Sequence, residues 1–299
     1  MTRYTELQIS SDLLDQPKFC GEPKKIFILS TPRSGSYLLC RHMINAGLGV
    51  PHEYFNPIII RQIAPRLGLG EAVRDLEWPM RGRGDLLLLR RGERAAELEF
   101  LTNYLRRLIP RRCQGGVFAA KIHHRDFVRV LDNPVGRQIL DGGVFVHLYR
   151  EDLLKQAVSE YFSQLTGRWG FDDAVTTRAP QNPDFFDYEA INRTLKDLAQ
   201  QDQAWRVFRA RTGAAALLIS YEKLCEDPFS FVLAIARRIG VDPQALRSGY
   251  SEPACPYETD SKLPSKKEVA AAYLAHVAAA EGASRWPGAA EFARILMRS

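Results

Sequence analysis

Residues 26–40 read IFILSTPRSGSYLLC, and this stretch decides the fold. Four apolar residues and a serine predict a short buried strand, and residues 37–46 continue as a helix. Between them lies the turn T-P-R-S-G-S, whose last four residues supply one arginine, one glycine and two serines. A strand that leads through a tight turn into a helix is the repeating unit of α/β folds, so we expect a parallel sheet.

Three further apolar runs predict the other strands of that sheet. They are short and bounded by glycine or polar residues, as buried parallel strands are. The runs lie at residues 117–122 (VFAAKI), 144–149 (VFVHLY) and 214–219 (AAALLI).

Helical patterns separate or follow these runs. Asp227 and Pro228 supply an N-cap and a first-turn proline for one helix, and Ser265 with Glu268 forms a capping box before another. A third helix carries one apolar stripe, made of Ile191, Leu195, Leu198, Trp205 and Phe208. Because strands that alternate with helices join by right-handed crossovers, we expect an α/β fold with three layers, α/β/α, around a mostly parallel sheet.

Length and composition limit the function only weakly. The 299 residues predict an N-terminal arm over residues 1–23 and a single domain over residues 24–299. No stretch approaches the ~18 apolar residues of a membrane span, so we expect a soluble cytoplasmic protein without a transmembrane segment. Five cysteines without a C-x-x-C pair fit a reducing compartment. The 41 Lys and Arg against 35 Asp and Glu favour phosphorylated partners, and we expect no nucleic acid among them.

The turn after the first strand is predicted to bind an anion. Its backbone N–H groups and the helix dipole attract phosphate or sulfate at the carboxyl edge of the sheet. Gly35 lets the backbone approach, and Arg33, Ser34 and Ser36 add side-chain donors. The turn does not match the nucleotide P-loop G-x-x-x-x-G-K-[ST], since it has no lysine and only one glycine. An ordinary, closely packed strand-turn-helix remains the alternative.

A second anion-binding pair follows the third strand. Arg150 comes directly after VFVHLY, and Ser159 lies nine residues further along a predicted helix. Arg33 and Arg150 should both emerge at the carboxyl edge, where open α/β sheets bind their ligands. The two pairs together predict a site for a ligand with two anionic groups.

This combination resembles the sulfotransferases that use 3′-phosphoadenosine 5′-phosphosulfate (PAPS). The segments RSGSYLLCRHMINAGLGVPHEYFNP, GVFAAKIHH and YREDLLKQAVSEYFSQLTGRW are similar to those of the bacterial trehalose 2-sulfotransferase family, and the likeness extends over residues 26–240. The resemblance implies a P-loop-like sulfotransferase fold, release of adenosine 3′,5′-bisphosphate (PAP), a carbohydrate or glycolipid acceptor, and pairing as a homodimer. It does not imply trehalose itself as the acceptor.

The resemblance also assigns donor-binding roles. It implies that the loop residues Arg33, Ser34, Gly35 and Ser36 take the 5′-phosphosulfate, and that Arg150 and Ser159 take the 3′-phosphate. Tyr37 stands where the family has threonine, so one short hydroxyl is missing from the cradle. Tyr221 stands where the family has D-Y-P, which suits either a contact with the nucleotide or a place in the core.

Glu53, in the PHEYF motif, matches the carboxylate base of the family. His52 and His123 are the rival bases, because a histidine needs less tuning to accept a proton near neutrality. Lys121 ends a strand and is placed to contact the sulfuryl group or the sugar, or to reach solvent. The pair His123-His124 does not predict a metal site, since adjacent strand residues point to opposite faces and no third ligand is evident.

Residues 81–112 hold nine arginines against four acidic residues. This segment is interpreted as a solvated helix face, with a surface for acidic sugars or for peripheral membrane contact as the alternative. Two other functions stay open at this point. One is a nucleotide or nucleoside kinase with a degenerate P-loop, and the other is a non-catalytic anion or glycan binder that keeps the fold.

Overall fold

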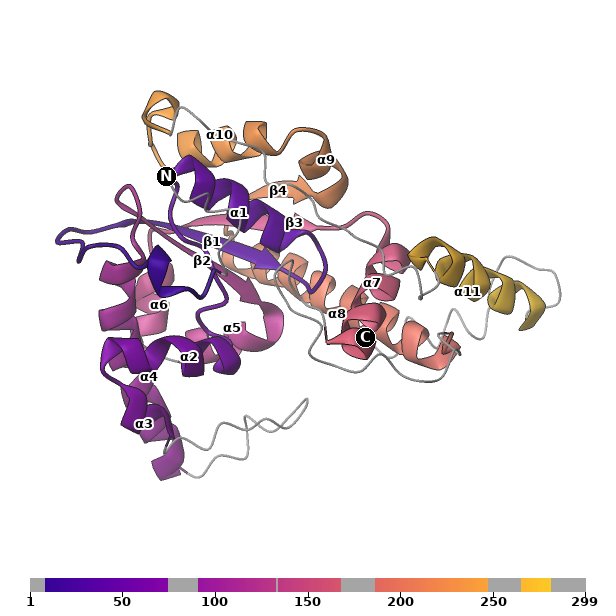
Figure 1. Ribbon diagram of the computed structural model, residues 1–299, viewed down its shortest axis with the longest axis horizontal. Coiled ribbons are helices and arrows are strands. Elements are labelled where there is room, and N and C mark those ends of the chain that lie inside the picture. The colour runs from indigo at the N-terminus through magenta and orange to yellow at the C-terminus, as the bar shows by residue number, and fades with distance from the viewer. Residues whose placement is uncertain (1–8, 75–90, 133, 168–185, 247–264, 281–299) are drawn as a thin grey trace.

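The computed structural model describes residues 9–74, 91–132, 134–167, 186–246 and 265–280 (Figure 1). At its centre lies a four-stranded parallel sheet in the order β2-β1-β3-β4. Each strand matches one of the predicted apolar runs to within two residues at either end. The strands are β1 (Lys24–Ser30), β2 (Val117–His123), β3 (Val144–Tyr149) and β4 (Ala216–Ser220).

Side-chain alternation along the strands divides the core into two apolar clusters. Ile26 and Ile28 of β1 and Val146 of β3 belong to one cluster, whereas Phe27 and Leu29 of β1 belong to the other. Since both faces of the inner strands are apolar, both faces need a covering layer.

Helices supply those two layers, as Figure 1 shows. The cluster around Ile26 and Ile28 is covered by α1 (Ser36–Ala46) and α10 (Pro228–Arg238). The opposite cluster is covered by α4 (Arg91–Arg112), α5 (His124–Asp132), α6 (Pro134–Leu140) and α8 (Tyr188–Thr212). The predicted α/β/α sandwich with a parallel sheet is confirmed.

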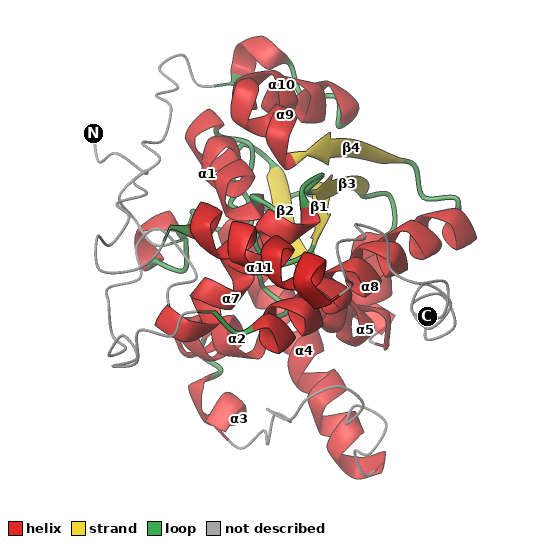
Figure 2. Cartoon of the chain, turned by 90° about the vertical axis from the view of Figure 1, so that its right-hand side faces the viewer, coloured by secondary structure: helices red, strands yellow, loops and turns green. Residues whose placement is uncertain are grey.

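Two helices extend the molecule beyond the sheet. α7 (Leu153–Thr166) packs on α8, and α11 (Lys266–Ala280) packs on α7. A small third apolar cluster, which includes Val158, Ile191 and Val269, joins these three helices. Figure 2 shows α11 and α7 in front of the sheet.

Shorter elements complete the described chain, and among its helices none is long and apolar enough to cross a membrane. They are α2 (Pro57–Ile63), η3 (Ala64–Leu67), α3 (Gly70–Arg74), α9 (Tyr221–Glu226), η2 (Asp12–Leu14) and η5 (Pro243–Ala245).

The predicted helix caps form. The Asp227 side chain accepts a hydrogen bond from the Ser230 amide at 3.1 Å. In the capping box, the Glu268 amide donates to Ser265 Oγ at 3.2 Å, and the Ser265 amide donates to Glu268 Oε2 at 2.7 Å. The box therefore fixes the first turn of α11 and so the place of Lys266, its first residue.

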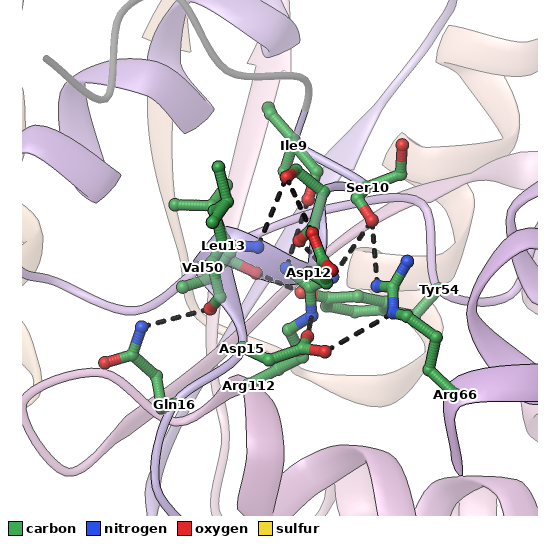
Figure 3. Close-up of polar contacts among 12 residues, drawn as sticks. Ile9, Ser10, Asp12, Leu13, Asp15, Gln16, Val50, Tyr54, Arg66 and Arg112 are labelled. Carbon is green, nitrogen blue, oxygen red and sulfur yellow. Dashed lines mark hydrogen bonds and ion pairs between the residues drawn. The ribbon is translucent and has the colours of Figure 1, made fainter. Parts of the chain in front are cut away.

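The part of the N-terminal arm that the structure describes is held by a buried arginine (Figure 3). Arg112, at the end of α4, is fully buried; it donates to the carbonyl oxygens of Ile9 at 3.1 Å and Ser11 at 3.2 Å, and pairs with Asp15 at 2.9 Å. Arg66 also pairs with Asp15, at 3.4 Å. Arg112 therefore does not belong to a solvated helix face, contrary to the expectation for residues 81–112; residues 75–90 lie outside the described ranges.

Candidate active site

The turn between β1 and α1 has a constrained backbone. Arg33 has a φ of 59° and Gly35 a φ of 84°, both in the left-handed region. A Cβ atom at Gly35 would lie 2.3 Å from a ring carbon of Tyr221, so glycine is required by space as well as by φ. The Ser34 hydroxyl donates to the Thr31 carbonyl at 2.8 Å and closes the turn. A non-glycine residue in the left-handed region is a form of strain that gathers at functional sites.

Helix α7 holds this turn from the side. Gln156 Nε2 donates to Thr31 Oγ1 at 2.8 Å and to the Pro32 carbonyl at 2.6 Å. One turn further on, Ser159 Oγ accepts from Arg33 Nε at 3.2 Å. The Q-A-x-S sequence thus joins α7 to the anion loop. Sequence reasoning gave Gln156 no role, although its spacing of three from Ser159 places both on one helix face.

Two cationic side chains, Arg33 and Lys266, contact Ser159, and the charge of a third, Arg150, acts on Lys266. Lys266 Nζ donates to Ser159 Oγ at 3.2 Å, and Arg33 Nε donates to the same oxygen at 3.2 Å. Burial, together with the charges of Arg33 and Arg150, lowers the pKa of Lys266 to about 8. Positive groups that repel one another in a partly buried place create a site for an anion.

Arg150 completes this cationic group from the end of β3. Its guanidinium lies over the Tyr221 ring, 4.5 Å from the ring centroid, and its Nε is 3.9 Å from Glu222. Tyr221 begins α9 directly after β4, so its ring lies between Arg150 and the Gly35 turn. The ring is thus a wall of the predicted anion site.

The sequence pattern did not predict Lys266 as a site residue. The capping box predicted the helix that it begins, but nothing in the local pattern separates Lys266 from Lys267, which is exposed. Only the packing of α11 on α7 brings Lys266 to Ser159.

The candidate base lies in a second group of side chains. Residue 52 forms an isolated parallel bridge with residue 120 of β2, and the Lys121 amide donates to the His52 carbonyl at 2.9 Å. This pairing brings Glu53 Oε1 to 2.5 Å from Lys121 Nζ and 3.2 Å from His123 Nε2. Asn56 Nδ2 donates to Glu53 Oε2 at 2.7 Å. The group joins the anion loop through Ser30, whose carbonyl lies 3.2 Å from His123 Nδ1.

Electrostatics separates Glu53 from the rival base His52. Burial raises the pKa of Glu53, but Lys121 and His123 outweigh burial and hold that pKa well below the usual value for a glutamate. Burial lowers the pKa of His52 to about 3, and its ring lies edge-on to Tyr54. Glu53 is therefore an ionised carboxylate among donors, whereas the His52 ring is a buried, weakly basic group.

The remaining predicted residues lie as follows. The Tyr37 ring lies 5.2 Å from the guanidinium of Arg41 and packs against the cluster between α1 and α10. Ser36 is the buried first residue of α1. His124 lies edge-on to Trp205 at 5.5 Å, whereas His123 contacts Glu53. Within the described ranges, no group of three or more His, Cys, Asp or Glu side chains has the spacing of a metal site.

These groups meet at one edge of the sheet. Arg33, Arg150 and Tyr221 follow the ends of β1, β3 and β4, and Lys121 lies near the end of β2. A group of cationic side chains and an ionised carboxylate thus flank the same turn, at the edge where parallel sheets bind ligands.

The sequence profile of the family described as Stf0 sulphotransferase matches residues 26–262, well over half of the chain. This chain belongs to the Stf0 sulfotransferase family. Both groups of the candidate site lie within the matched segment, except for Lys266.

Two known proteins illustrate the likeness. The trehalose 2-sulfotransferase of Mycobacterium tuberculosis (strain ATCC 35801 / TMC 107 / Erdman) is 31% identical over 102 residues, which cover 34% of this chain and 37% of that protein. The chain thus matches little more than a third of the length of this relative. The solved sulfotransferase domain of the Synechococcus PCC 7002 olefin synthase covers 76% of this chain and 77% of its own, with 21% identity and a TM-score of 0.34.

Proposed function

We propose that this sulfotransferase moves a sulfuryl group from PAPS to a hydroxyl group of a carbohydrate or glycolipid. The observation that carries the proposal is that Arg33 and Lys266 both contact Ser159, with the charge of Arg150 acting on Lys266, at the edge of the sheet that also holds the hydrogen-bonded carboxylate Glu53. A bisphosphorylated donor needs two anion-binding places, and an acceptor hydroxyl needs a base close to the first of them. The trehalose 2-sulfotransferase relative supports a carbohydrate acceptor.

Each side chain has a task in this reaction. Arg33 and the N–H groups of its turn neutralise the charge that grows on the leaving phosphate as the S–O bond to the donor breaks. Glu53 accepts the proton of the acceptor hydroxyl group while the hydroxyl oxygen forms its bond to sulfur. Arg150, Ser159 and Lys266 hold the 3′-phosphate, which fixes the distance between donor and acceptor. Lys121 leaves Glu53 to contact the transferred group.

The cellular setting is part of the proposal. Cys20, Cys40, Cys113 and Cys225 are free thiols, which suits the reducing cytoplasm. A peripheral contact with a membrane would serve a glycolipid acceptor. We also propose a homodimer, which a sedimentation mass near that of one 33.8 kDa chain, measured with PAP present, would contradict.

The direct test is turnover of labelled PAPS against a panel of glycans and glycolipids. Sulfated product from at least one acceptor is expected. Thermal-shift measurements should show stabilisation by PAP and not by ATP. Stabilisation by ATP together with phosphoryl transfer would favour a kinase, and binding of PAP without any turnover would favour a non-catalytic protein.

The 3′-phosphate site gives a sharper binding prediction. Arg150→Ala and Lys266→Ala should each weaken PAP binding on the order of 10- to 100-fold, as expected for a lost charged hydrogen bond. Binding of adenosine 5′-phosphosulfate, which has no 3′-phosphate, should change little. Calorimetric titration of both ligands measures the difference, with the exposed Lys267→Ala as the matched control.

Lys266 adds a pH dependence to this prediction. Since its pKa of about 8 means that it loses its charge as the pH rises through that value, wild-type affinity for PAP should fall there. Lys266→Arg should keep the affinity and lose the pH dependence, because arginine stays charged. If the alanine variants weaken the binding of PAP and of adenosine 5′-phosphosulfate equally, Arg150 and Lys266 do not belong to the 3′-phosphate site.

A further inference from the structure

Glu160 is a second buried carboxyl group beside the anion loop, and the proposed reaction gives it no task. It lies on α7, directly after Ser159 and four residues after Gln156, the two side chains that contact the loop. Positions four apart share a helix face, so Glu160 belongs to the face that holds the turn. The residue is 7% exposed.

The Glu160 carboxyl group is poorly satisfied. Gln164 Nε2 donates to its Oε1 at 3.4 Å, which is a weak contact. Its buried Oε2 has no hydrogen-bond partner in the described part of the chain. Buried polar atoms without a partner are rare in proteins, and such an atom beside a binding site marks a place where a ligand completes the hydrogen bonding.

The charges that act on Glu160 come from both groups of the candidate site. Burial raises its pKa and outweighs the lowering influence of Arg33, His123 and Arg125. Arg33 belongs to the anion loop, and His123 contacts the base Glu53. Glu160 is therefore within electrostatic reach of both the donor group and the base group.

The chemistry of Oε2 decides between the two substrates. When Glu160 is ionised, Oε2 can only accept a hydrogen bond, and the phosphate and sulfuryl groups of PAPS have no hydrogen to donate to it. A hydroxyl group of the sugar substrate can donate that hydrogen bond.

We propose that Glu160 binds the acceptor, with Oε2 accepting a hydrogen bond from a second hydroxyl group, distinct from the one that gives its proton to Glu53. The site thereby selects polyhydroxylated acceptors, such as sugars, over simple alcohols. This inference rests on the proposed sulfuryl transfer and adds a specificity-determining residue to it.

The test combines Glu160 variants with trimmed acceptors. The panel acceptor with the highest turnover is compared with its monodeoxy analogues, in wild type, Glu160→Leu and the isosteric Glu160→Gln. Glu160→Leu should lower kcat/KM for the full acceptor on the order of 10- to 100-fold, mainly through KM, because one hydrogen bond to a charged group is lost. Glu160→Gln keeps an oxygen that can accept a hydrogen bond, so its kcat/KM should lie between those of wild type and Glu160→Leu. Gln164→Ala, which loses only the weak contact, is the matched control.

One monodeoxy analogue should identify the bound hydroxyl. In the wild type, kcat/KM should be lower for this analogue than for the full acceptor by about the factor that Glu160→Leu produces with the full acceptor. In Glu160→Leu, kcat/KM should be the same for both acceptors, because the variant and the analogue each remove the same interaction. If, for every analogue, the kcat/KM loss caused by the analogue multiplies with the loss caused by Glu160→Leu, the proposal is overturned. If Glu160→Leu does not fold, the same cycle is run with Glu160→Gln.

Donor binding separates this inference from the proposed function. Calorimetric affinity for PAP should stay the same or tighten in Glu160→Leu, since a negative group near Arg33 is removed. A tenfold weaker affinity for PAP with unchanged acceptor preference would assign Glu160 to the donor site and overturn the inference while the transfer reaction stands. If the wild-type protein sulfates no acceptor in the panel, that result overturns both the proposed transfer reaction and the role of Glu160.

Discussion

Glu53→Gln is expected to lower turnover on the order of 10²- to 10⁴-fold, the range of a lost general base, while affinity for PAP changes little. Glutamine keeps the shape of the side chain and a hydrogen bond to Asn56 or Lys121, but it cannot accept the proton of the acceptor hydroxyl. Single-turnover sulfation with saturating PAP measures the chemical step directly.

The pH dependence gives the same prediction a second readout. Because Lys121 and His123 hold the pKa of Glu53 well below 4.5, the carboxylate stays ionised until the pH falls through that low value. The wild-type rate should therefore decline only at strongly acidic pH, and Glu53→Gln should lack this acidic limb. His52→Gln is the control and should stay close to wild type, since the pKa of His52 is about 3 and its ring packs on Tyr54. A large loss in His123→Gln with Glu53→Gln nearly intact would transfer the role of base to His123.

The fold could be predicted because its signals are local. The four strands are continuous apolar runs, and buried parallel strands carry this pattern without help from distant residues. The caps at Asp227 and at Ser265 with Glu268 involve atoms within three residues of one another. The order of the strands in the sheet could not be predicted from these local signals, because β1 lies between β2 and β3 although β2 precedes β3 in the chain.

The candidate site could be predicted only where a motif is continuous. The R-S-G-S turn and the Q-A-V-S helix each lie in one segment, and the sequence predicted Arg33 and Arg150 at the same edge, with Ser159 on the helix that follows. Lys266 reaches Ser159 across 107 positions, and the contacts of Asn56 with Glu53 and of Gln156 with Thr31 are visible only in the structure. Glu160 lay inside a quoted motif, but only its burial and its unpartnered oxygen distinguish it from an ordinary helix glutamate.

The choice among His52, Glu53 and His123 also needed the structure. The sequence supplied the family match for Glu53 and the favourable ordinary pKa of histidine for its rivals. The bridge beside β2 turns Glu53 towards Lys121 and His123, and burial then removes the basicity of His52. Alternation along an extended segment, which separates adjacent side chains, is the physical reason that His52 and Glu53 differ so much.

Lys121→Met should have the second large effect, because Lys121 pairs with Glu53 at 2.5 Å and, in the proposed reaction, contacts the sulfuryl group during transfer. Turnover near neutral pH is expected to fall on the order of 10²- to 10³-fold, as for a lost electrostatic donor to a transition state. The methionine keeps most of the length and the apolar stem of the lysine, so the buried end of β2 should stay packed. Affinity for PAP and thermal stability are measured in parallel.

The acidic limb of the rate distinguishes a direct role of Lys121 in transfer from a merely structural one. Burial raises the pKa of Glu53 and Lys121 is the largest opposing influence, so removal of Lys121 should raise that pKa. A carboxylate with a higher pKa takes up a proton at a higher pH, so the residual activity of Lys121→Met should begin to decline at a higher pH than that of wild type. The exposed Lys155→Met, which breaks only the pair with Asp152 at 2.7 Å, should change neither rate nor limb. A shifted limb with an unchanged rate at neutral pH would show that Lys121 sets the pKa of Glu53 without contacting the transferred group. An unshifted limb would instead separate Lys121 from the base altogether.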